Sequence, residues 1–175
     1  RSSPIQIPGT WNSVSSSTYT NIGTKTDGTL WSWGDNDNGY LGQNDTIEYS
    51  SPVQIGAGTD WGLVNSDISR YALGAIKTDG TLWTWGSNNS GSTGTNTGSA
   101  RSSPVQVPGT PWKLVAWGDD GSAGATKTDG TLWQWANNAS GQLGQNNETT
   151  YSSPRQVPGT WNTVAQARLK TFALR

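Results

Sequence analysis

Cysteine, histidine and methionine are all absent from this chain of 175 residues. Without cysteine the chain has no disulfide framework and no thiolate metal site. Without histidine it lacks the commonest general base and the commonest metal ligand. We therefore predict no catalytic residues, no metal site and no cofactor. Because methionine is missing even at position 1, we expect a processed chain or a piece of a longer polypeptide.

Charge is also scarce, since only 13% of the residues are charged and the formal net charge is −1. The eleven lysines and arginines are scattered, whereas nucleic-acid binding needs them clustered, so we expect no nucleic-acid partner. No apolar run approaches the roughly 18 residues that a membrane-spanning helix needs. Eleven tryptophans argue against disorder, because disordered chains are poor in aromatic residues.

One heptapeptide, Lys-Thr-Asp-Gly-Thr-Leu-Trp, occurs three times, at 25–31, 77–83 and 127–133. Self-similarity with a period near fifty residues is typical of propellers, solenoids and other arrays. The sequence divides into units at about 1–48, 49–100 and 101–150, with a partial unit at 151–175. Each repeated residue is therefore expected to build the unit.

Every complete unit contains four short extended segments. One follows Ser-Ser-Pro and alternates apolar and polar residues, as in Val53-Gln54-Ile55. Another begins at a tryptophan, as in Trp61 to Val64, and the last two flank an Asp-Gly pair. Four strands per unit without helical periodicity predict an all-β fold made of propeller blades of four antiparallel strands. About three and a half blades are present.

The Asp-Gly pairs predict two-residue type I′ hairpin turns, which place Lys25 opposite Leu30 and Thr24 opposite Trp31. Tryptophans two residues apart then share one face of a strand, where they pack one blade on the next. The residues predicted to build the repeat in this way are Asp27, Gly28, Asp79, Gly80, Asp129 and Gly130 in the turns, and Trp31, Trp33, Trp83, Trp85, Trp133 and Trp135 in the strands.

Three linked signatures recur in order along the chain. Ser-Ser-Pro-Val-Gln-Val is followed by Trp-x-x-Val, then by Lys-Thr-Asp-Gly-Thr-Leu-Trp-x-Trp-Gly and by Asn-x-x-Gly-x-Leu-Gly. Over essentially its whole length the chain resembles the bacterial and phage branch of the regulator-of-chromosome-condensation repeat family. The resemblance implies a β-propeller, usually of seven blades. Members of that family include an exchange factor for a small nuclear GTPase, ubiquitin-ligase subunits, a plant photoreceptor and many uncharacterised microbial and viral proteins.

The repeat count leaves an open ring. The fourth unit reaches Leu174 where the next Asp-Gly hairpin is due, and an open propeller leaves strand edges bare. Two explanations remain open. Either further blades of the same longer chain complete the ring, or a second copy of about three and a half blades closes it.

Function in a repeated scaffold is carried by residues that depart from the repeat. The candidate partner-binding residues are Asp67, Arg70, Tyr71, Trp117, Asp119 and Asp120. Trp117 has no counterpart in the other units, so on an exposed loop it would anchor a partner or stack on a sugar; otherwise it fills local space. The segment 35–39 resembles a calcium loop but departs from EF-hand spacing, so we interpret it as a solvated turn.

The main functional prediction is a non-enzymatic structural or binding propeller that contacts a protein or glycan surface. Composition and the resemblance place it on a phage virion, in the extracellular space or on a microbial cell surface. The alternative is an intracellular protein-interaction scaffold or an exchange-factor-like regulator. A glycan-active enzyme that uses aspartate pairs is the third hypothesis.

Overall fold

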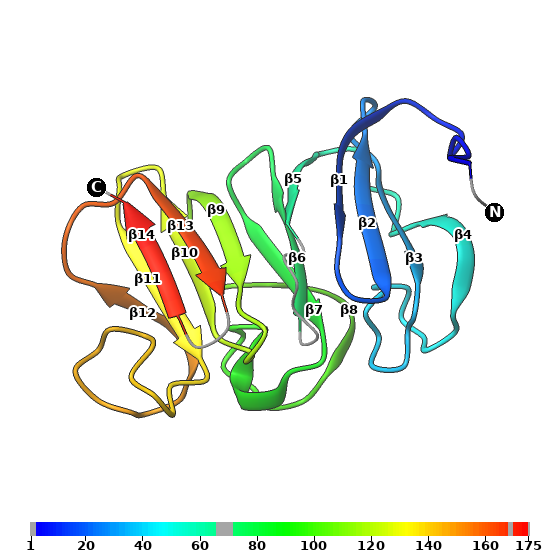
Figure 1. The fold of residues 1–175 in the computed structure, drawn as a ribbon. Helices are drawn as coiled ribbons and strands as arrows, with labels where there is room; N and C mark the ends of the chain where they lie inside the picture. The colour runs from blue at the N-terminus through cyan, green and yellow to red at the C-terminus, as the bar shows by residue number, and fades with distance from the viewer. Residues whose placement is uncertain (1–2, 66–71, 168–169, 175) are drawn as a thin grey trace.

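A computed structural model describes residues 3–65, 72–167 and 170–174, and in this part of the chain the fold is all-β. Three four-stranded antiparallel sheets follow one another along the chain, each with its strands in sequence order. Figure 1 shows them side by side, as the blades of a propeller. The predicted fold class is therefore confirmed.

The first blade contains β1 (Trp11–Ser16), β2 (Thr20–Lys25), β3 (Leu30–Gly34) and β4 (Tyr49–Gln54). The second contains β5 (Trp61–Asn65), β6 (Ala72–Lys77), β7 (Leu82–Gly86) and β8 (Arg101–Gln106), with the 3₁₀ turn η1 (Asn89–Gly91) between β7 and β8. The third contains β9 (Trp112–Trp117), β10 (Ala123–Lys127), β11 (Leu132–Ala136) and β12 (Tyr151–Val157). Strands β13 (Thr163–Ala167) and β14 (Lys170–Leu174) form a two-stranded sheet.

The blades are offset from the sequence units. A Ser-Ser-Pro segment, which the repeat places at the start of its own unit, forms the fourth strand of the preceding blade, as β4, β8 and β12 show. In each case its glutamine lies opposite the first tryptophan of the third strand, as Gln54 does opposite Trp31. The first copy of the segment, at 3–7, forms no strand.

The register predicted for the Asp-Gly hairpins is wrong by one residue. Thr24 lies opposite Leu30, and the N–H of Gly28 donates to the carbonyl of Lys25 at 3.0 Å. Gly28 has a positive φ of 80° and Asp27 does not, so the turn is a type I turn with a glycine bulge and not type I′. Asp27 Oδ1 accepts hydrogen bonds from the N–H and the hydroxyl of Thr29, which fixes this turn locally.

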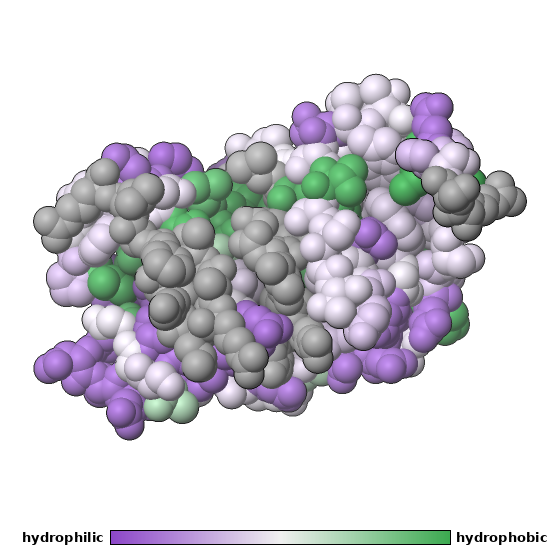
Figure 2. Space-filling model, viewed as in Figure 1, coloured by the Kyte–Doolittle hydropathy of each residue, from purple (hydrophilic) through white to green (hydrophobic). Residues whose placement is uncertain are grey.

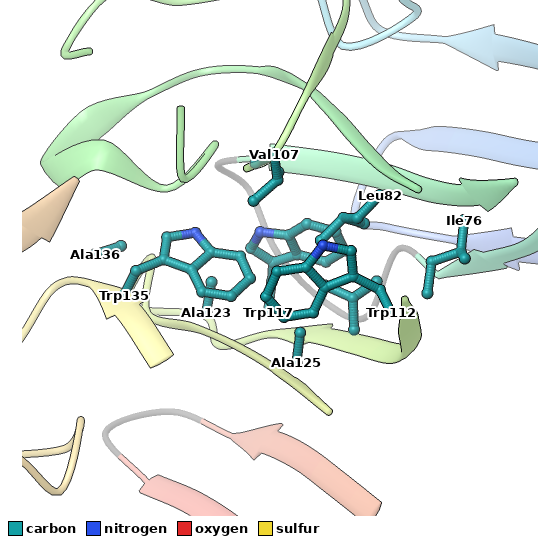
Figure 3. Packing of buried hydrophobic residues seen from close by; sticks show 11 residues of the cluster. Ile76, Leu82, Val107, Trp112, Trp117, Ala123, Ala125, Trp135 and Ala136 are labelled. Carbon is teal, nitrogen blue, oxygen red and sulfur yellow. The ribbon is translucent and has the colours of Figure 1, made fainter. Parts of the chain in front are cut away.

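Successive blades are held together by hydrophobic clusters that each contain residues of two blades. Between the second and third blades, Leu82 and Val107 pack with Trp112 and Trp135 (Figure 3). Val115 belongs to the same cluster. Equivalent clusters join the first blade to the second and the third blade to β13. Burial of large aromatic and aliphatic side chains is the main favourable contribution to this stacking.

The Asp-Gly turns also dock on the next blade through the backbone. The carbonyls of Gly28, Gly80 and Gly130 accept hydrogen bonds of 3.1, 2.8 and 2.7 Å from the N–H of Trp61, Trp112 and Trp161. The repeated turn therefore serves both its own hairpin and the contact with the following blade.

The outer face of the first blade is open. Val14 is 52% exposed, whereas its counterparts Val64, Val115 and Val164 are 8%, 2% and 7% exposed because a preceding blade covers them. Ile7 is likewise 40% exposed, against 3% for Ile55 and 0% for Val107. Both explanations for closing the ring stay predictions.

Within the described ranges, no helix is long and apolar enough to cross a membrane.

Candidate functional site

The antiparallel strands place two kinds of loop at opposite ends of the blades. The turn face carries the repeated Asp-Gly hairpins at 26–29, 78–81 and 128–131. The loop face carries the segments 17–19, 35–48, 87–100, 118–122 and 137–150, which lie along the lower edge of Figure 1. In Figure 2, hydrophilic surface lines this lower edge. Departures from the repeat concentrate on the loop face, which makes it the candidate binding surface.

Three of the predicted partner-binding residues, Asp67, Arg70 and Tyr71, lie outside the described residues. Trp117 does not lie on an exposed loop. It ends strand β9, it is 1% exposed, and its Nε1 donates to the backbone carbonyl of Ser92 at 3.2 Å (Figure 3). The prediction that Trp117 anchors a partner from an exposed loop is therefore wrong, because the ring fills space between the second and third blades.

Asp119 and Asp120 occupy the turn between β9 and β10 on the loop face, and both are half-buried. Asp120 Oδ1 accepts hydrogen bonds from the N–H and hydroxyl of Ser122, and its Oδ2 accepts one of 2.6 Å from Gln142 Nε2. Asp120 thus links the two loop-face loops of the third blade. A role of this pair in partner binding stays a prediction.

A hollow in the loop face of the first blade was not predicted from the sequence. It has a volume of about 160 Å³ and lies between the β1–β2 turn and the loop that follows β3. We call it the first-blade hollow; its lining residues are Ser17, Thr18, Tyr19, Thr20, Asp35, Asp37, Asn38 and Tyr40. Tyr19 is 68% exposed, so its ring is available to a ligand.

A wider depression adjoins the first-blade hollow and shares Tyr19 and Asp35 with it. It adds Glu48 and Tyr49, and its volume is about 560 Å³. The carboxylate oxygens of Asp35, Asp37 and Glu48 lie within 4.8 Å of one another. At the rim, the hydroxyl of Tyr49 donates to Asp45 Oδ2 at 3.1 Å, and this hydrogen bond raises the pKa of Tyr49.

A buried asparagine holds the long loop that forms the hollow. Asn36 is 0% exposed, its Nδ2 donates to the carbonyl of Ile47 at 3.0 Å, and its Oδ1 accepts from the N–H of Leu41 at 2.8 Å. Asn88 and Asn138 make the same contacts in the other blades. The segment 35–39 is therefore an anchored loop and not merely a solvated turn. Asp35 and Asp37 are the neighbours of Asn36, whose hydrogen bonds fix the backbone at this point.

The sequence signal at this site is a difference between the units, which by itself suits a solvated turn as well as a binding site. Asp35, Asp37 and Glu48 stand where the second unit has Ser87, Asn89 and Ala100 and the third has Asn137, Ala139 and Thr150. All three carboxylates are thus particular to the first blade, and the repeat does not require them. Chemically, the site offers carboxylate oxygens, hydroxyls and an exposed aromatic ring, a combination suited to binding a cation.

The carboxylates could also ligate a hard divalent cation, because such ions take oxygen ligands. Asp37 and Glu48 are exposed and Asp35 is half-buried, so the three oxygens sit at the surface and not in a closed cage.

The matches to known proteins fall on the same repeat. The sequence model of the regulator of chromosome condensation (RCC1) repeat matches residues 27–65 and 79–124. The protein RCC2 homolog of Danio rerio is 38% identical over 96 residues, which are 53% of this chain and 19% of that protein. The ubiquitin-protein ligase HERC2 of Homo sapiens is 32% identical over 89 residues, or 51% of this chain and 2% of HERC2. The chain thus spans only a small part of these relatives.

Among solved structures, Prp20p from Saccharomyces cerevisiae superposes on 93% of this chain and 42% of its own, with a TM-score of 0.77 and 17% identity. Human WBSCR16 superposes on 93% of this chain and 57% of its own, with a TM-score of 0.51 and 16% identity. At these identities the likeness shows the fold alone.

The prediction of a virion, extracellular or cell-surface location is wrong, because it conflicts with the matched RCC2 relatives, which are intracellular regulators. The motifs, the four-stranded blades and these matches agree with one another. The chain resembles the proteins built from RCC1 repeats, in its sequence motifs and in its fold.

Proposed function

We propose that this chain is part of a protein-interaction propeller, and that its loop face contacts a protein partner. The observation that carries the proposal is the division of each blade into a repeated part and a variable part. The strands and Asp-Gly turns repeat and pack the blades together, whereas the anchored loops of the loop face differ from blade to blade. A rigid scaffold that presents variable loops is a common design of binding proteins.

The comparisons support protein binding in general. Prp20p binds Gsp1p and histones, and yeast RCC1 binds Kap60. For this chain we propose binding without catalysis, since RCC1-family proteins are mostly regulators or binders. An exchange-factor-like regulator is a specific form of the same proposal. It would raise the rate of nucleotide release from a GTPase partner.

The test compares two variants that each carry three lysines at exposed positions. One places them on the loop face, with Asn89→Lys, Ala100→Lys and Thr150→Lys; the other places them on the turn face, with Ala57→Lys, Thr78→Lys and Thr128→Lys. Proteins retained from an extract by the unchanged chain are quantified by mass spectrometry and confirmed with purified partner. We expect the loop-face variant to lose the partner and the turn-face variant to keep it.

The reverse pattern would place binding on the turn face and overturn the proposal. So would a partner that both variants retain equally. Both variants leave the lining of the first-blade hollow unchanged, so this test does not depend on that hollow. Circular dichroism of the variants checks that the fold is kept.

A further inference from the structure

We propose that the first-blade hollow binds an arginine side chain of a protein partner. The guanidinium lies between the ring of Tyr19 and the carboxylates of Asp35 and Asp37, and it also reaches Glu48 of the adjoining depression. This inference rests on the proposed function and specifies the chemistry of the contact. Four observations carry it: the concave surface, the exposed aromatic ring, the uncompensated carboxylates, and the arginines found near the matching positions of the other two blades.

The carboxylates lack a counter-charge within the part of the chain that the structure describes. No described lysine or arginine forms an ion pair with Asp35, Asp37 or Glu48; the ion pair that the described residues do form joins Lys77 to Asp60 at 3.0 Å, on the turn face. The carboxylates of Asp37 and Glu48 accept no hydrogen bond from any described residue. Three like charges this close repel one another, and a bound cation removes that repulsion.

The other blades carry an arginine near the position that Tyr49 occupies in the first. Tyr49 begins β4 opposite Gly34, and the matching positions are Arg101 at the start of β8 and Tyr151 at the start of β12. In the third blade the guanidinium of Arg155 lies 4.9 Å from the centre of the Tyr151 ring. In the second blade Arg101 itself supplies the guanidinium, and its Nη2 donates to Thr97 Oγ1 at 3.4 Å.

The first blade breaks this pattern. Val53 stands at the position of Arg155, and Tyr49 stands at the position of Arg101, so neither arginine has a counterpart there. In the second and third blades a guanidinium thus lies at, or over, the residue that matches Tyr49. The first blade has more negative charge at the corner and no arginine of its own. A guanidinium supplied by a protein partner would bring the positive charge that this corner lacks.

Arginine suits the hollow better than lysine or a metal ion. Its planar guanidinium stacks on an aromatic face and donates paired hydrogen bonds to carboxylates, whereas an ammonium is a compact and strongly hydrated charge. The exposed ring of Tyr19 would add nothing to a divalent cation, but it offers a stacking surface to a guanidinium.

The probe for the test is the tripeptide acetyl-Gly-Arg-Gly-amide, and its control is the same peptide with citrulline, which keeps the shape of arginine and removes the charge. Binding to the full chain is followed by the NMR shifts of the backbone amides at 17–20 and 35–50. We expect the arginine peptide to shift these amides in a saturable way and the citrulline peptide to leave them unchanged.

Two variants and one matched control locate the site. Asp37→Asn is expected to weaken binding about tenfold, because it removes a charge-assisted hydrogen bond. Tyr19→Ala is expected to weaken it about threefold through the lost cation–π contact. Glu148→Gln, which neutralises an exposed carboxylate on the loop face of the third blade, is expected to leave the affinity unchanged.

Equal binding of the arginine and citrulline peptides would overturn the proposal. So would an equal loss of affinity in Glu148→Gln and Asp37→Asn. If calcium chloride shifts the same amides while the arginine peptide does not, the hollow is a metal site and the proposal is wrong. None of these outcomes depends on the triple-lysine test of the loop face, so the two proposals can fail separately.

Discussion

The indole Nε1 of Trp85 donates a hydrogen bond of 2.8 Å to the backbone carbonyl of Tyr40. Trp85 belongs to the third strand of the second blade, and Tyr40 lines the hollow of the first. The contact spans 45 residues of sequence and ties the long loop of one blade to the core of the next. Trp135 repeats it one blade later, with a bond of 3.1 Å to the carbonyl of Ser92. The loops of the loop face are therefore positioned by the neighbouring blade.

Replacing this tryptophan tests the contact. Trp85→Phe keeps an aromatic ring but leaves the Tyr40 carbonyl without its indole donor, so we expect a loss of about 2 kcal/mol in the free energy of unfolding. Trp135→Phe is the matched control. The carbonyl of Ser92 keeps a second donor there, Trp117 Nε1 at 3.2 Å, so the loss should be smaller. Urea unfolding measures both, and equal losses would contradict the interpretation.

The glycine of the Asp-Gly turn has a second role at the contact between blades. Gly28 has a φ of +80°, and a Cβ there would collide with the backbone carbonyl of Thr59. Gly141 has a similar φ of +69°, but no atom lies within 4 Å of the place where its Cβ would be. We expect Gly141→Ala to cost about 1 kcal/mol from the backbone conformation alone. Gly28→Ala should cost clearly more, and similar losses of unfolding free energy would show that the close approach is unimportant.

The open face of the first blade predicts unequal effects of one substitution. Val115→Ala removes two methyl groups from a site that is 2% exposed, which should cost about 2 kcal/mol including the cavity left behind. Val14→Ala acts at the matching position, which is 52% exposed, so in the isolated chain it should cost well under half of that. Thermal unfolding compares them. A large loss for Val14→Ala would indicate that another blade or copy covers this face in solution.

Stability should fall in acid because of the three Asp-Gly turns. Hydrogen bonds from Thr29, Thr81 and Thr131 lower the pKa of Asp27, Asp79 and Asp129 in the folded protein. A group whose folded-state pKa is depressed contributes stability above its unfolded pKa, about 3.9 for aspartate, and loses it as the pH falls through the folded-state value. Unfolding free energy should therefore decline below about pH 4.

The matched variant for this prediction carries Asn at all three positions. It keeps an acceptor oxygen for the threonine and removes the titration, so its stability should change less between about pH 5 and pH 2. Melting temperatures across this range provide the measurement. Parallel profiles for the two proteins would show that other carboxylates dominate the acid response.

Much of the architecture could be predicted from sequence because the repeat is nearly identical in three copies. The period gives the length of a unit, and the Asp-Gly pairs mark a turn through their local backbone conformation. The paired tryptophans mark a strand, because residues two apart share one face of it. The hairpin register was less predictable, because Asp-Gly suits both a two-residue and a three-residue turn. The hydrogen bonds between Asp27 and Thr29 decide between them. Assignment of the Ser-Ser-Pro segment to the preceding blade depends on which edge is free to pair, and the sequence does not show that.

The candidate site could be predicted only in part. The loops that depart from the repeat do contain the candidate site. The prediction that Trp117 lies on an exposed loop was wrong, because the lack of a counterpart in the other units says nothing about the burial of its side chain. Asp35 and Asp37 have no counterpart in Ser87 and Asn89 of the next unit, but this difference alone suits a solvated turn. The approach of Glu48, which completes the group, depends on the folded loop and is not visible in the sequence.

The repeat, the strands and the absence of cysteine and histidine chemistry follow from residue identity and near-neighbour geometry, so they can be read from the chain alone. Which carboxylates meet depends on the folded molecule. Asp35 and Glu48 are thirteen positions apart in the chain, and their approach depends on the buried side chain of Asn36, which fixes the loop between them. Folding of that loop against Trp85 of the next blade, a contact between residues far apart in sequence, converts three scattered charges into one site.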